Sequence, residues 1–206
     1  MRDSRVQKGF TLVELIVALI VTAIVLTAAV TLAFAVEKAN DVTADLSLKQ
    51  AQVRFATMRI QELIRHCRLI CSSSSSGFAL WRSDDNNDEH INIGEIVYID
   101  WGPNQSYLRI CEFSSSDSSV ISIGSIEALA TNWWLSYSSD VNYIRVLPQC
   151  SNVQCGFDVS PPQSQFVRLS FEVTENDAPH QYQINTKIRG WAGNLLDTGN
   201  IVHDDD

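Results

Sequence analysis

The chain has 206 residues, enough for one ordinary domain with an appendage but hardly for two full domains. With 45% hydrophobic residues, 19% charged residues and five tryptophans, its composition is typical of a folded protein. The formal net charge of −9 argues against a nucleic-acid-binding surface, which needs clustered lysine and arginine. Five cysteines are an odd number, so at least one thiol is free or pairs with another chain.

The N-terminal segment has the composition of a membrane-spanning helix. Three basic residues, Arg2, Arg5 and Lys8, precede an uncharged run from Leu15 to Val36. As a helix that run measures about 33 Å at about 1.5 Å per residue, enough to cross the hydrocarbon core of a bilayer. Because basic residues stay in the cytoplasm, we expect a single pass through the cytoplasmic membrane, with everything after Val36 outside.

Two other interpretations of the apolar run stay open. A secretory signal peptide has a shorter core, of about 7–15 residues, and a small-residue cleavage site, which Ala33-Phe34-Ala35 could imitate. A plain signal anchor fits the length but leaves Glu14 unexplained. A charged side chain inside a spanning helix costs about 2.5–3.5 kcal/mol on insertion scales, so a segment that is only an anchor has no reason to carry one.

The order of residues around Glu14 is specific. A basic leader is followed by Gly9, by Phe10 and by the apolar helix that contains Glu14, in the sequence KGFTLVELIVALIV. This order resembles the class III signal of type IV prepilins and type II secretion pseudopilins. The resemblance implies that a prepilin peptidase cuts between Gly9 and Phe10 on the cytoplasmic side and methylates the new N-terminal Phe10. It also implies that Glu14, fifth in the mature chain, acts during assembly.

Electrostatics supplies a physical role for Glu14. Cleavage after Gly9 would create an α-amine on Phe10, and a carboxylate on a neighbouring helix can pair with this amine inside the membrane. A paired buried charge is tolerable where a lone one is costly. We therefore expect Glu14 to contact other pilin or pseudopilin subunits and not to act as a catalytic acid. The alternative is a glutamate that extends to the membrane interface near the start of the helix.

The polar continuation of the chain, residues 37–71, keeps a helical pattern. Its apolar residues recur mostly three or four positions apart, which predicts an amphipathic helix packed under a globular head. They are Leu46, Val53, Ala56, Ile60, Leu63, Cys67 and Cys71. Because neither Pro nor Gly occurs from Phe10 to Ser76, we expect one helix from about Thr11 to Ile70.

The head has the pattern of an antiparallel sheet. The serine run 72–76 is expected to end the helix and begin the head. Two hairpins are predicted, with strands at 95–101 and 107–111 and at 165–173 and 182–188, and a further strand at 142–147. A sheet laid against a long helix is an α+β fold. The hairpin 95–113 resembles the corresponding region of larger minor pilins and J-type pseudopilins, which implies a minor or tip subunit.

The predicted organisation therefore has four parts. They are a leader (1–9), the transmembrane half of the helix (10–36), its amphipathic half (37–71), and an extracytoplasmic β-rich head with an acidic tail (72–206).

An acidic loop before the first hairpin suggests calcium. Asp84, Asn86, Asp88 and Glu95 stand at positions 1, 3, 5 and 12 of an EF-hand-like spacing, and hard cations prefer such oxygen ligands. Position six, where the sharp turn needs glycine, is Glu89, and a strand pattern follows in place of a helix. A solvated acidic loop is therefore the alternative to a calcium site.

The cysteines divide into two groups. Cys150 and Cys155 bracket a short polar loop, and outside the cytoplasm a disulfide between them is plausible. Cys67 and Cys71 are expected one helical turn apart, where their Cβ atoms lie too far from each other for an easy disulfide. One of them could pair with Cys111 on the sheet, or all three could be core thiols.

The sequence contains no nucleophile elbow, zinc-protease motif, P-loop or dinucleotide fingerprint. We therefore expect a structural subunit, not an enzyme, whose partners are the prepilin peptidase, membrane lipid and other subunits of a type IV pilus or type II secretion pseudopilus. The alternative is a signal-anchored extracytoplasmic binding domain that does not assemble, with calcium at the acidic loop as a candidate requirement for its binding.

Overall fold

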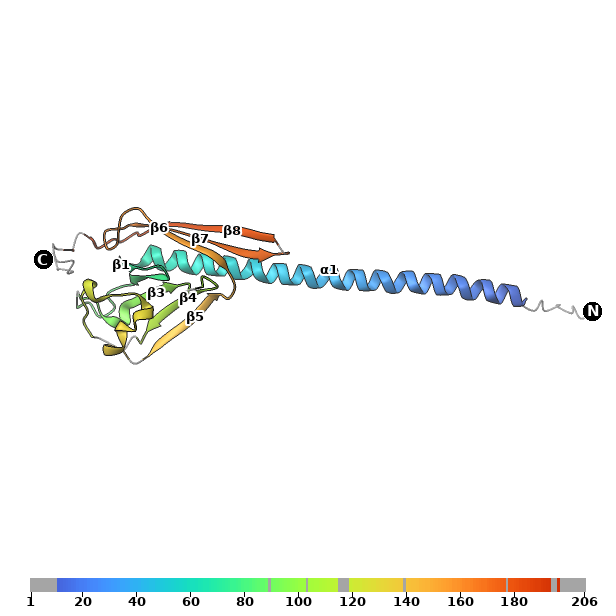
Figure 1. The fold of residues 1–206 in the computed structure, drawn as a ribbon, viewed down its shortest axis with the longest axis horizontal. Helices are drawn as coiled ribbons and strands as arrows, with labels where there is room; N and C mark the ends of the chain where they lie inside the picture. The colour runs from blue at the N-terminus through green and yellow to red at the C-terminus, as the bar shows by residue number, and fades with distance from the viewer. Residues whose placement is uncertain are drawn as a thin grey trace, which may run out of the picture. The chain divides into compact units, whose positions relative to one another are not determined.

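The computed structural model describes residues 11–88, 90–102, 104–114, 119–138, 140–176, 178–193 and 196 (Figure 1). It opens with one long helix, α1 (Leu12–His66), followed by strands and short 3-10 turns. By its internal contacts the chain divides into two compact units between Ser47 and Leu48. The fold class is α+β, as predicted.

The first unit is the apolar part of α1. Large apolar side chains from Leu12 to Val36 are exposed on every side of the helix, so this part has no polar face to turn toward water. Of the helices in the described residues, α1 is long and apolar enough to cross a membrane, and none of its most apolar stretch is buried. A helix that is apolar all round needs lipid or other apolar helices around it.

The threonines in this apolar part satisfy their own hydroxyl groups. Thr22 Oγ1 donates to the carbonyl of Ala18 at 2.7 Å, and Thr27 Oγ1 donates to that of Ala23 at 2.8 Å. Thr31 makes the same kind of bond one turn back. Because each hydroxyl is hydrogen-bonded within the helix, the threonines can enter an apolar environment without an unsatisfied hydrogen-bond donor.

The head half of α1 is amphipathic, as its spacing predicted. Val53, Ala56, Ile60, Leu63 and Ile64 are buried along one side. The predicted end at Ile70 was wrong, because the helix stops at His66. The amide of Arg68 instead donates to the carbonyl of Trp81. The residues after His66, which the local pattern assigned to the helix, therefore pair with β2.

The larger sheet has five antiparallel strands in the order β1-β2-β3-β4-β5. They are β1 (Leu69–Ser73), β2 (Gly77–Trp81), β3 (Ile96–Asp100), β4 (Leu108–Phe113) and β5 (Val141–Leu147). The predicted hairpin of β3 and β4 and the predicted strand β5 are confirmed. The serine run does not simply separate helix from head, because Ser72 and Ser73 belong to β1 and the next three serines make the turn to β2.

A second sheet has three antiparallel strands in the order β6-β7-β8. They are β6 (Ser151–Phe157), β7 (Phe166–Glu175) and β8 (Ala178–Lys187), and the predicted pair of β7 and β8 is confirmed. The two sheets lie on either side of the head half of α1 (Figure 1). One core joins all three, with Ile60 from the helix, Ile99 and Ile110 from the large sheet, and Leu169 and Phe171 from the small one, all fully buried.

The other face of the large sheet has its own cover. Three 3-10 turns, η2 (Ile123–Ser125), η3 (Leu129–Thr131) and η4 (Trp133–Ser136), enclose a second core around Tyr98 and Phe113. Tyr98 Oη donates to the carbonyl of Glu127, and Trp133 Nε1 donates to Tyr98 Oη at 2.9 Å. These bonds fix the cover to the middle of the sheet.

The helix core gives a direct test. Ile60 is fully buried, whereas Met58, two residues away on the same helix, is 62% exposed. We expect Ile60→Ala to lower the free energy of unfolding of the head by about 2–5 kcal/mol, because it leaves a cavity against both sheets. Met58→Ala should change it by about 0.5 kcal/mol or less. Denaturant titration of the full chain in detergent, followed by tryptophan fluorescence, measures both, and equal effects would contradict the shared core.

Candidate functional site

Glu14 closes the N-terminal end of α1. The backbone amide and the hydroxyl of Thr11 both donate to Glu14 Oε2, each at 3.0 Å, and the amide of Glu14 donates to Thr11 Oγ1 at 3.3 Å. This reciprocal pair, three residues apart, is a capping box, in which each side chain satisfies an amide that the helix leaves unpaired. The carboxylate also lies at the positive end of the helix dipole, where negative charge is favourable.

Glu14 therefore has a local partner that the sequence analysis did not assign to it. The spacing Thr11-x-x-Glu14 was a sequence signal for this cap. Both side chains remain exposed, so the carboxylate can be reached from outside the helix. Gly9 and Phe10 lie outside the described residues, and the predicted cleavage between them stays a prediction.

Comparison with protein families finds one match in this part of the chain. Residues 4–30 match the family model described as the prokaryotic N-terminal methylation motif. The chain carries the methylation signal of a prepilin. The signal indicates a precursor of the type IV pilin and pseudopilin kind, a structural subunit that a prepilin peptidase processes. No curated protein and no solved structure matches the chain.

Beyond the methylation signal, the acidic loop brings three of its four predicted calcium ligands together. The amide of Asp88 donates to Asp84 Oδ1 at 3.2 Å and to Asn86 Oδ1 at 3.1 Å. Asn86 Nδ2 in turn donates to Asp88 Oδ2 at 2.7 Å. Such side-chain to backbone bonds stabilise a tight turn without any ion.

The fourth predicted ligand, Glu95, has a structural partner set. Its side chain is buried, at 4% exposure, and accepts hydrogen bonds from Trp81 Nε1 at 3.0 Å, the amide of Asp85 at 2.8 Å and the amide of Asn92 at 3.2 Å. Within the part of the chain that the structure describes, no group of three His, Cys, Asp or Glu side chains is placed to hold a metal ion. Calcium binding here stays a prediction.

Hydrogen bonds favour the charged carboxylates in this loop. The bond from Ser83 Oγ, at 2.5 Å, holds the pKa of Asp85 below its usual value; burial raises that pKa, and the contact with Arg82 lowers it further. Loss of some hydration raises the pKa of Asp88, but the bonds from Asn92 Nδ2 and neighbouring groups lower it by more. The loop is therefore most stable when both groups are ionised.

All five cysteines are free thiols in the structure, and the predicted disulfide between Cys150 and Cys155 is absent. Cys155 lies within β6 and Cys150 immediately precedes it. Five residues of strand, at about 3.3 Å each, extend well beyond the Cα separation that a disulfide allows. Burial raises the pKa of Cys150 to about 11 and that of Cys155 to about 12, so both stay protonated near neutral pH.

The other cysteines are core thiols. Cys71 is not on the helix, as the pattern suggested, but on β1. Two strands separate it from Cys111 on β4, so a disulfide between them is too long at about 4.8 Å per strand. Cys67 belongs to the helix core, on the opposite face of the sheet from Cys111.

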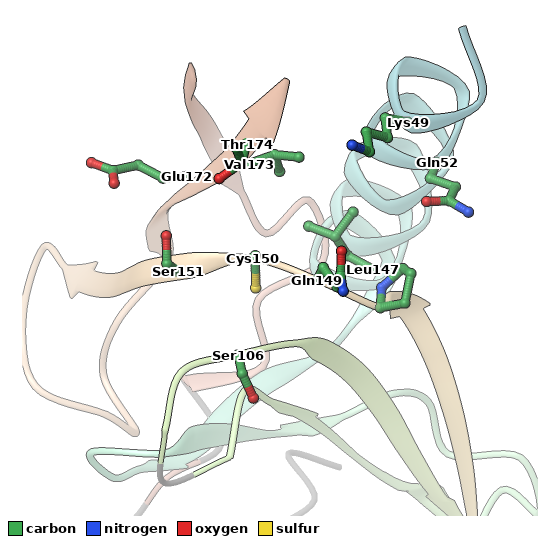
Figure 2. A pocket seen from close by; sticks show the side chains of 11 residues that line it. Lys49, Gln52, Ser106, Leu147, Gln149, Cys150, Ser151, Glu172, Val173 and Thr174 are labelled. Carbon is green, nitrogen blue, oxygen red and sulfur yellow. The ribbon is translucent and has the colours of Figure 1, made fainter. Parts of the chain in front are cut away.

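A pocket of about 330 Å³ lies where the two sheets part (Figure 2). Its walls come from four places: α1, the turn before β4, the link from β5 to β6, and β7. The lining residues are Lys49, Gln52, Ser106, Leu147, Pro148, Gln149, Cys150, Ser151, Glu172, Val173 and Thr174. No sequence pattern predicts this pocket, because its lining residues come from segments far apart in the chain. Its lining is a mixed polar and apolar surface without a nucleophile and base in contact.

The structural role of Glu95 is testable. We expect Glu95→Gln to lower the free energy of unfolding by about 1–3 kcal/mol, because an NH₂ group replaces one carboxylate oxygen and faces at least one of the donors that this oxygen accepted from. Glu62→Gln is the matched control, since Glu62 is exposed, and should change little. Unfolding is measured in EDTA, so that no metal contributes. Equal stability of the two variants would contradict this role.

The acidic loop also predicts a pH dependence. Because the folded pKa of Asp85 is lowered, its stabilising contribution is present above the unfolded value, near about 3.9, and is lost as the pH falls through the folded pKa. We expect Asp85→Asn to show a shallower loss of stability than wild type below about pH 4. Melting temperatures from pH 7 to pH 2.5 measure this, and parallel curves would contradict it.

Proposed function

We propose that this chain is a pilin-like structural subunit that assembles into a type IV pilus or a type II secretion pseudopilus. A prepilin peptidase cuts it between Gly9 and Phe10 and methylates Phe10. The first half of α1 spans the cytoplasmic membrane, with the N-terminus in the cytoplasm and the head outside. The match of residues 4–30 to the methylation motif is the observation that carries the proposal.

The chemistry of the span supports assembly. Apolar side chains cover every side of α1 from Leu12 to Val36, so neighbouring spans can pack on any side of it. Within this otherwise apolar surface Glu14 is the one charged side chain of the described span. An ionic contact between two spans can therefore use only Glu14. Its partner would be the positively charged α-amine of Phe10 on a neighbouring subunit.

The capping box adds a step to this proposal. Glu14 Oε2 already accepts two hydrogen bonds from Thr11. A neighbour's amine must therefore either share this carboxylate or take it from the cap. The capped state keeps the charge of Glu14 solvated by its own chain before assembly, and a full opposite charge replaces dipoles when the subunit docks.

We place the subunit among minor or tip components. The head contains two sheets and a separate cover over the large sheet, and this size and loop content favour a specialised subunit over a bulk one. The competing function is a signal-anchored binding domain that inserts in the membrane and never assembles. Such a domain has no use for Glu14, and this difference separates the two functions.

We expect Glu14→Val to be processed but to be lost from filaments. The experiment uses a host that contains a prepilin peptidase and its filament system. Mass spectrometry of the membrane-extracted protein should find an N-terminal peptide that begins at Phe10 with one added methyl group, for wild type and variant alike. Immunoblots of sheared or cross-linked filaments should contain at least tenfold less of the variant.

Glu37→Gln is the matched control, because it removes a charge at the other end of the apolar part and should assemble normally. A chain that still begins at Met1, or one cut near Ala35, would overturn the pilin-like proposal. Normal processing with equal incorporation of Glu14→Val would leave a processed subunit but remove Glu14 from its assembly.

A further inference from the structure

A second pocket, of about 500 Å³, opens on the large sheet beside the η2–η4 cover and shares no residue with the pocket of Figure 2. Its walls come from the β1–β2 turn, the end of β3, the β3–β4 turn, η3 with the residue after it, and the strands β4 and β5. Polar and apolar atoms share these walls about equally, and one ion pair lies among the polar side chains. The polar wall residues are Ser75, Ser76, Gln105 and Asn132, with Asp100 and Arg109 as the ion pair.

The guanidinium of Arg109 is held on three sides. Its Nε donates to Asp100 Oδ2 at 2.5 Å, and Asp100 is 5% exposed. The ring of Tyr143 lies 4.4 Å from the guanidinium carbon and that of Tyr107 lies 5.1 Å from it. The bond to Asp100 uses Nε and not the two terminal nitrogens. The group is thus fixed in position, with its double-donor end available to a planar anion.

A second arginine stands directly opposite the first. A bulge between Leu108 and Arg109 shifts the register of β4 on β5, so that Arg109 pairs with Arg145. Like charges opposite each other on neighbouring strands are destabilising. The ring of Tyr107 accommodates both cations, since Arg145 lies 5.3 Å from its centre. Two arginines against Asp100 leave a positive charge here, in a chain whose net charge is −9.

The turns around the pocket hold unusual backbone conformations. Gly102, Gln105 and Asn132 have φ values of +67°, +51° and +54°, and all three line the pocket. A Cβ on Gly102 would come within 2.5 Å of the hydroxyl of Tyr107, so glycine lets this ring lie beside the turn. Positive φ outside glycine is uncommon and gathers at functional sites.

We propose that this pocket binds an acidic saccharide, with a sugar carboxylate on Arg109 and the sugar hydroxyls on the side chains of Gln105, Asn132 and the serines. Arg145 does not line the pocket, but as the strand neighbour of Arg109 it adds a second positive charge that attracts the carboxylate. A planar carboxylate matches the double-donor end of a guanidinium. An acidic peptide is the less favoured ligand, because a protein partner is usually anchored by a large apolar side chain in an apolar pocket. Here the apolar lining residues are Leu129, Ala130 and the ring of Tyr143, and the polar side chains lie among them.

The test is calorimetric titration of the full chain, in a polyoxyethylene detergent free of sugar groups. The probes are oligogalacturonate and sialyllactose, with lactose as the neutral control and hexaglutamate as the acidic peptide. We expect wild type to bind at least one acidic saccharide, and to bind it at least tenfold more tightly than lactose or hexaglutamate. The affinity should fall as salt rises.

Arg109→Gln and Arg145→Gln should each weaken this binding at least tenfold. Arg145 is exposed, so its variant keeps the proposal testable if the loss of Arg109 leaves Asp100 unpaired and unfolds the head. Arg168→Gln, an exposed arginine on β7, is the matched control and should bind as wild type does. Melting curves confirm that each variant is folded.

Three results would overturn the proposal: no binding of either acidic saccharide by folded wild type, equal binding by Arg145→Gln, or equal binding of lactose. Preferential binding of hexaglutamate would assign the pocket to an acidic segment of a protein partner, and it would overturn the proposal that the ligand is a saccharide. The binding site does not depend on the proposed assembly, because every residue in it lies in the head.

Discussion

Burial of one side of α1, from Val53 to Ile64, is the contact on which the head depends. The large and small sheets each present an apolar face toward the helix. The helix side chains fill the space between them, with Ile60 and Ile64 fully buried. After the helix ends, the amide of Arg68 donates to the carbonyl of Trp81 at the end of β2. This bond begins the pairing of β1 with β2 in the large sheet.

Three acidic side chains show how the environment decides what a carboxylate does. Glu14 is exposed and bonded to its own chain, so a stronger partner can displace that bond. Glu95 is buried and bonded to three donors from three segments, which makes it a structural acceptor. Asp100 is buried and paired with Arg109, so it fixes a cation. Buried charges persist only where such partners exist, and each partner set indicates a different role.

Local sequence predicted the elements whose own residues carry the signal. The long helix, the β3–β4 hairpin, β5 and the β7–β8 pair follow from spacing and β-branched residues. The strands β1, β2 and β6 escaped prediction because their sequences, such as LICSS and SNVQCGF, are weak in β pattern and depend on their neighbours for pairing. The same dependence ended the helix at His66, since strand pairing took the next residues.

The sequence by itself determined the membrane end of this protein: an apolar run with one glutamate, a glycine and a basic leader in a fixed order. Those features consist of composition and short spacings within one segment, so they can be recognised without knowing which other segments pack against it. Tertiary structure alone decided the environment of Glu95, the absence of the Cys150–Cys155 bridge and the meeting of Arg109 with Arg145. The meeting of the two arginines depends on the single bulge between Leu108 and Arg109. A shift of one residue in strand register moves every following side chain to the other face of the sheet.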